Sequence, residues 1–102
     1  MAEARLHPRF RLRAFADVIG TEVLLGREVA DISLGGLRFS GKGWEAPGAK
    51  LDIVLCFPDQ SAATVHVTGE VVRASDRDMG IKFVGMSDEQ RWALKKHVKA
   101  PT

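Results

Sequence analysis

The sequence predicts a mainly β domain, a six-stranded antiparallel β-barrel with a C-terminal α-helix. Three observations favour this class. Glycines and polar turns cut the chain into short apolar runs of strand length. In the central runs, apolar and polar residues alternate with the period of two that a half-buried strand requires. Near the C-terminus the period changes to that of a helix, and no strand is followed by a crossover long enough for parallel pairing.

The first half of the chain contains three predicted strands. Phe10–Ile19 and Val23–Ile32 flank the turn at Gly20 and Thr21, and Gly26 is a point where the second strand is expected to break. Leu37–Phe39 forms a short third strand. These strands are expected to pair as neighbours in an antiparallel sheet.

Three further strands follow, and two of them show the clearest alternation. The segment 51–57 has apolar residues at every odd position, and 65–71 repeats this pattern with polar residues between. The last strand contains Ile81 and Phe83. The apolar set is expected to fill the core of the barrel, and its aromatic members are Phe39, Phe57 and Phe83.

The segment 87–99 is predicted to be a helix. Ser87 and Gln90 have the spacing of a capping box, in which the serine side chain bonds a first-turn N–H and the glutamine reaches back. Leu94 and Val98 are four residues apart, with Trp92 nearby. We expect these three apolar side chains to bury against the barrel.

Length and composition limit the class of protein. The 102 residues fit a single domain, residues 1–102, and 45% hydrophobic with 27% charged residues is ordinary for a globular protein. A net charge of +2 is too small to indicate general nucleic-acid binding. There is no apolar run long enough to span a membrane and no secretory signal, so the cytoplasm is the expected location. Cys56, the single cysteine, is expected to be a small core residue.

Positive charge is concentrated at the N-terminus. Four arginines lie within nine residues, which suggests a local anion site on a flexible arm, residues 1–13. The guanidinium group binds phosphate in a bidentate manner and also stacks on a purine ring. Arg5 and Arg9 are four apart and precede the first strand. Arg9 and Arg13 have the same spacing, but Arg13 is expected to lie on the strand itself.

A second cluster of candidate residues lies in the turn that follows the second strand. Asp31 offers a carboxylate that only accepts hydrogen bonds, which complements the N–H donors on the pairing edge of guanine. Ser33 offers a hydroxyl, and Gly36 leaves the backbone open to a ligand. The cluster also fits an ordinary serine-assisted turn between two strands.

Taken together, these motifs resemble those of the PilZ domain, a bacterial receptor module for cyclic di-GMP. Arg5-x-x-x-Arg9 is similar to the family's Arg-x-x-x-Arg motif, and Asp31-x-Ser33-x-x-Gly36 to its Asp/Asn-x-Ser-x-x-Gly motif. The stretch 79–84 and the segment after it resemble the last strand and closing helix of the family. The resemblance covers nearly the whole chain and implies a six-stranded barrel with a C-terminal helix.

The resemblance also implies a role for each motif residue. Arg5 and Arg9 would close over cyclic di-GMP and bind its phosphates and guanine faces. Asp31 would accept hydrogen bonds from guanine, Ser33 would contact the ligand or fix the turn, and Gly36 would keep the surface open. Many family members have a further arginine where this chain has Ala4. One bound ligand and a self-stacked ligand dimer therefore both remain open.

The expected function is that of a stand-alone, non-enzymatic cyclic di-GMP receptor. It would signal to a partner protein in motility, exopolysaccharide or transcription machinery, through the helix or through the region around Trp44. That tryptophan is equally suited to be a lid on the end of the barrel. The alternative is a PilZ-like interaction module that binds no nucleotide. Neither DNA nor RNA is expected, and no cofactor or metal is indicated because the histidines lack ligand spacing; they are His7, His66 and His97.

Overall fold

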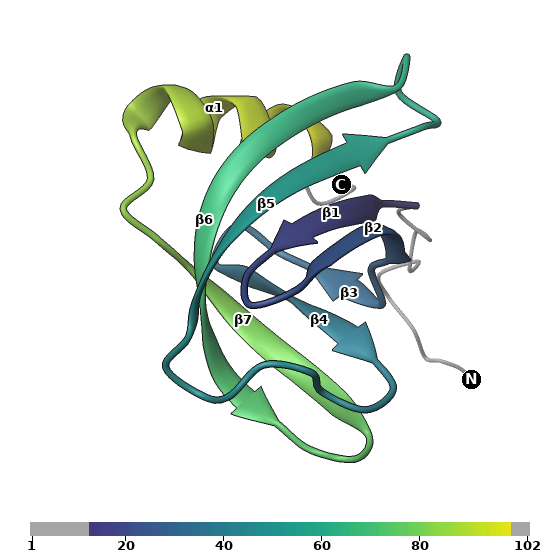
Figure 1. Ribbon diagram of the computed structural model, residues 1–102. Coiled ribbons are helices and arrows are strands. Elements are labelled where there is room, and N and C mark those ends of the chain that lie inside the picture. The colour runs from purple at the N-terminus through teal and green to yellow at the C-terminus, as the bar shows by residue number, and fades with distance from the viewer. Residues whose placement is uncertain (1–12, 99–102) are drawn as a thin grey trace, which may run out of the picture.

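The computed structural model describes residues 13–98, which form an antiparallel sheet and one helix (Figure 1). This confirms the mainly β class with a single C-terminal helix. No helix in this part of the chain is long and apolar enough to cross a membrane. The elements in chain order are β1 (Phe15–Ile19), β2 (Val23–Glu28), β3 (Asp31–Ile32), β4 (Gly36–Ser40), β5 (Lys50–Phe57), β6 (Ala63–Ala74), β7 (Asp78–Val84) and α1 (Asp88–His97).

The described sheet has seven strands in the order β2-β1-β5-β6-β7-β4-β3, and it is not closed. The predicted count of six and the predicted closed barrel were therefore wrong. The reason lies at Val29 and Ala30, where the chain changes its pairing partner. Val29 N–H donates to Ala14 at one edge of the sheet, and Ala30 N–H donates to Arg38 at the other. The expected strand Val23–Ile32 is thus two strands, β2 and β3, which lie at opposite edges of the sheet and do not pair with each other.

The expected break at Gly26 is a β-bulge inside β2. The pairing of β1 with β2 shifts between Ala16 and Val18, so that two residues of β2 oppose one residue of β1. Gly26 has a φ of 66°, a conformation that glycine adopts without steric cost. Its N–H donates to the carboxylate of Asp17 at 2.8 Å, which holds the bulge in place.

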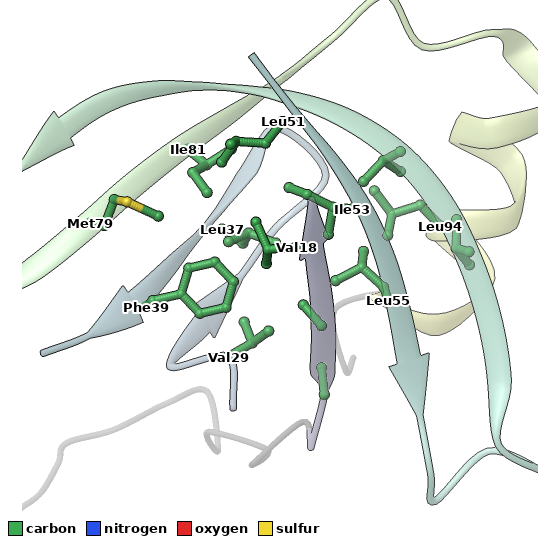
Figure 2. Packing of buried hydrophobic residues seen from close by; sticks show 14 of the residues in the cluster. Val18, Val29, Leu37, Phe39, Leu51, Ile53, Leu55, Met79, Ile81 and Leu94 are labelled. Carbon is green, nitrogen blue, oxygen red and sulfur yellow. The ribbon is translucent and has the colours of Figure 1, made fainter. Parts of the chain in front are cut away.

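The core lies on the concave side of the curved sheet (Figure 2). The predicted alternation is confirmed, because the odd positions of segments 51–57 and 65–71 are all buried. Phe39 and Phe57 are fully buried, and Phe83 is partly buried against the same cluster. Cys56 was wrongly assigned to the core. It occupies an even position of β5, which points outward, and it is only half-buried.

The helix α1 begins with the predicted capping box. Ser87 Oγ accepts from Gln90 N–H at 3.1 Å, and Gln90 Oε1 accepts from Ser87 N–H at 2.8 Å. Leu94 is fully buried and points into the core, as Figure 2 shows, while Val98 packs at its margin. The expected burial of Trp92 was wrong, since its side chain is 64% exposed. Two residues correspond to about 200° around a helix, so Trp92 and Leu94 lie on opposite faces.

Trp44 covers one end of the core, as a lid would. Its ring lies 5.2 Å from that of Phe39, and the guanidinium of Arg27 lies 4.6 Å from the centre of the indole. The next residue, Glu45, is 6% exposed and accepts hydrogen bonds from the amide and hydroxyl of Thr21, at 2.9 and 3.0 Å. This loop therefore fixes the turn between β1 and β2.

Replacing Glu45 with alanine is expected to destabilise the fold. The substitution removes the two hydrogen bonds from Thr21 to the Glu45 carboxylate, and a hydrogen bond to a charged group contributes roughly 1.5–3 kcal/mol. The free energy of unfolding, measured by urea denaturation, should fall by this amount. Glu22→Ala removes an exposed carboxylate from the same turn and should change the stability little. Equal effects of the two substitutions would contradict a structural role for Glu45.

Candidate functional site

The Asp-x-Ser-x-x-Gly motif forms the hairpin between β3 and β4. Asp31 is opposite Arg38 and Ile32 is opposite Leu37, so the strands are joined by a very short turn. Ser33 N–H donates to the carbonyl of Gly36 at 2.9 Å and closes this turn. The structure therefore brings the three predicted residues of this motif together on one hairpin at an edge of the sheet.

Ser33 fixes the geometry of the turn. Its hydroxyl oxygen accepts from Gly35 N–H at 3.2 Å. The carbonyl of Gly35 in turn accepts from Phe83 N–H at 2.9 Å, which ties the tip of the hairpin to β7. Ser33 and Gly35 are both exposed, so the turn is held firmly but is open to solvent.

Gly36 is required by close packing inside the sheet. It is opposite Lys82 on β7, and a Cβ atom built at Gly36 would lie 2.2 Å from the carbonyl oxygen of Ile81. No side chain fits at this distance. The sequence suggested that Gly36 keeps the surface open to a ligand, and the geometry adds a reason within the fold.

The Asp31 side chain is 63% exposed and forms an ion pair with Arg38. Arg38 Nε and Nη2 both donate to the same carboxylate oxygen, Oδ2, at 2.9 and 2.6 Å. Sequence reasoning missed Arg38. The signal was present, because a two-residue loop at Leu34 and Gly35 places residues 31 and 38 opposite each other across the hairpin.

The ion pair continues across the outer face of the sheet. Arg38 Nη1 lies 3.6 Å from Asp78 Oδ2, and Asp78 also accepts from Arg73 Nε and Nη2 at 3.1 and 3.0 Å. The hydrogen bond from Arg73 lowers the pKa of the Asp78 carboxyl. Asp78 therefore stays ionised at neutral pH and gives Arg38 a second anionic partner.

The Arg5-x-x-x-Arg9 motif lies outside the described residues. The alternative to Arg5 as a partner of Arg9 was Arg13, which is exposed and precedes β1. Its guanidinium pairs with Asp59, in the connection between β5 and β6, at 3.1 Å. Within the described part of the chain, Arg13 thus already has an anionic partner.

Fold and site together define a small mainly β binding domain with an exposed carboxylate and hydroxyl on an edge hairpin. The chain matches the family model of the PilZ domain over residues 3–100, which is nearly its whole length. It therefore belongs to the PilZ domain family, a family of receptor domains for a second messenger and not of known enzymes. No curated protein matches the chain.

Proposed function

We propose that this protein is a non-enzymatic, cytoplasmic receptor for cyclic di-GMP. One observation carries the proposal. A chain that matches the PilZ family over residues 3–100 presents Asp31 and Ser33 of the family's motif side by side on an exposed hairpin.

The chemistry of the hairpin suits a guanine ring. The pairing edge of guanine has adjacent N–H donors, and an ionised carboxylate offers about four lone-pair sites to accept them. Asp31 uses only its Oδ2 atom for Arg38, and no described residue donates to Oδ1. Arg5 and Arg9 would supply the guanidinium groups that bind phosphate, in line with their place in the motif.

Binding would serve as a signal to a partner protein in motility, exopolysaccharide or transcription machinery. Capture of the ligand by Arg5 and Arg9 would bring the segment that bears them onto the ligand, and a partner would sense the resulting complex. The alternative is a PilZ-like module that contacts its partner without nucleotide. In that alternative, the ion pair between Asp31 and Arg38 would serve only to stabilise the β3–β4 hairpin.

Single substitutions distinguish the candidate pair Arg5 and Arg9 from the candidate pair Arg9 and Arg13. Arg5→Ala and Arg9→Ala are expected to weaken cyclic di-GMP binding about 10- to 150-fold, because a hydrogen bond to a charged group contributes roughly 1.5–3 kcal/mol. Arg13→Ala is the matched control and should leave the affinity nearly unchanged. Calorimetric titration of the three variants measures these affinities.

The dependence of affinity on salt gives a second test of the same clamp. Binding by the wild-type protein should weaken as salt rises, since exposed phosphate contacts are screened. Arg9→Ala should show a shallower dependence. A loss confined to Arg13→Ala, or affinity that does not change with salt, would assign phosphate binding to other groups.

A further inference from the structure

Four charged side chains of alternating sign span four adjacent strands beside the hairpin. Asp31, Arg38, Asp78 and Arg73 come from β3, β4, β7 and β6. Their successive closest contacts are 2.6, 3.6 and 3.0 Å. Arg38 lies at the centre of this row and is the only one of the two arginines that contacts Asp31.

The strand β4 and two carboxylates together fix the orientation of the Arg38 side chain. Leu37 and Phe39 on either side of it are buried, so the alternation of β4 turns Arg38 to the outer face. Two of its nitrogen atoms bond Asp31, while the third faces Asp78. Arg38 is less exposed than Asp31, with 37% against 63% of the side chain accessible.

The contact with Arg38 fixes the Asp31 side chain but leaves part of its carboxylate free to accept further hydrogen bonds. Both hydrogen bonds from Arg38 end on Oδ2, and Oδ1 receives none from residues 13–98. Of the roughly four lone-pair sites of an ionised carboxylate, Arg38 occupies the two on Oδ2, and the two on Oδ1 are left to accept a ligand. The side chain is thus fixed in one orientation while an acceptor surface remains open to solvent.

We propose that Arg38 is a positioning residue for guanine recognition, holding the Asp31 carboxylate oriented toward the N–H donors of the base. This inference rests on the proposed function. A preset acceptor binds more tightly than one that must be ordered by the ligand, because the ordering cost is removed in advance. Arg38 acts through Asp31 and does not itself contact the nucleotide.

The test is a calorimetric titration of Arg38→Ala with cyclic di-GMP. Affinity should fall about 2- to 12-fold, the range for ordering one side chain on binding. Arg38→Lys keeps the charge but lacks the planar fork, so it should recover part of this loss. Arg91→Ala, which removes an exposed arginine from α1, is the matched control and should bind like the wild type.

Two readouts separate positioning from a general structural effect. Cyclic di-AMP lacks the paired N–H donors of guanine. The ratio of the affinity for cyclic di-GMP to that for cyclic di-AMP should therefore fall in Arg38→Ala. A general loosening of the fold would instead weaken the binding of both ligands by the same factor. The double variant Asp31→Ala/Arg38→Ala should bind no more weakly than Asp31→Ala alone.

Three outcomes would contradict the inference, each for a different reason. Unchanged or tighter binding by Arg38→Ala would show that Arg38 does not position Asp31, or that it competes with the ligand. Additive losses in the double variant would show that Arg38 contacts the nucleotide directly. Absence of binding by the wild-type protein would overturn the proposed function and this inference with it.

Discussion

Asp31→Ala is expected to weaken cyclic di-GMP binding about 10- to 150-fold. The substitution removes the proposed acceptor of the guanine N–H groups, and a hydrogen bond to a charged group contributes roughly 1.5–3 kcal/mol. The fold should remain cooperative, because Asp31 is exposed and lies on a short edge strand. Titration calorimetry measures the affinity, and thermal unfolding checks the fold.

Asp52→Ala is the matched control for this experiment. Asp52 is also an exposed aspartate on a strand, but it lies on β5, in the middle of the sheet and away from the hairpin. Its loss should leave affinity unchanged. If Asp52→Ala weakens binding as much as Asp31→Ala does, the effect is one of net charge and the hairpin is not the guanine site.

Gly36→Ala is expected to destabilise the fold and to displace the candidate site. The new Cβ would lie 2.2 Å from the backbone oxygen of Ile81, and a backbone atom cannot swing aside as a side chain does. Relief requires β4 to move away from β7, and overpacking of this kind typically costs about 1–3 kcal/mol. The free energy of unfolding in urea should fall accordingly, and ligand affinity should fall because the hairpin is displaced.

The neighbouring glycine provides the control. A Cβ at Gly35 would have Ser33 Oγ as its nearest neighbour, at 3.9 Å, and its φ is not in the left-handed region. Gly35→Ala should therefore be neutral, or slightly stabilising through the unfolded chain. Similar losses of stability in both variants would rule out close packing against Ile81 as the reason for Gly36.

The strands were predictable where burial alternates strictly. In β5 and β6 one face packs against the core and the other is more exposed to solvent, so the period of two appears directly in the sequence. The edge strand β2 has no buried residue, and its sequence carries no information about where its pairing ends. The change of partner at Val29 and Ala30, and with it the seventh strand and the open sheet, depends on long-range pairing.

The helix shows the same division between local and tertiary information. The capping box is formed by residues three apart, so the sequence alone predicted it correctly. The fate of Trp92 depends on which face of the helix meets the sheet. Leu94 and Val98 define that face, and Trp92 is left on the other side, where Lys96 Nζ lies 4.8 Å from the centre of its indole ring.

The candidate site was predictable as a motif but not as a network. Spacing placed Asp31, Ser33 and Gly36 in one turn, and the structure has them there. The partner of Asp31 on β4 follows from the hairpin register, which requires the turn length to be known first. Asp78 lies on a strand that is distant in sequence, and only the pairing of β4 with β7 brings it to Arg38.

Titration of the purified protein with cyclic di-GMP by calorimetry tests the central claim most directly, with GMP and the linear dinucleotide as controls. The account predicts saturable heat for the cyclic ligand alone, and the stoichiometry distinguishes one bound ligand from a stacked dimer. No heat at about 100 µM, about 100-fold above a dissociation constant of about 1 µM (a binding free energy of about −8 kcal/mol), would contradict it. The protein would then be an interaction module that binds its partner without nucleotide.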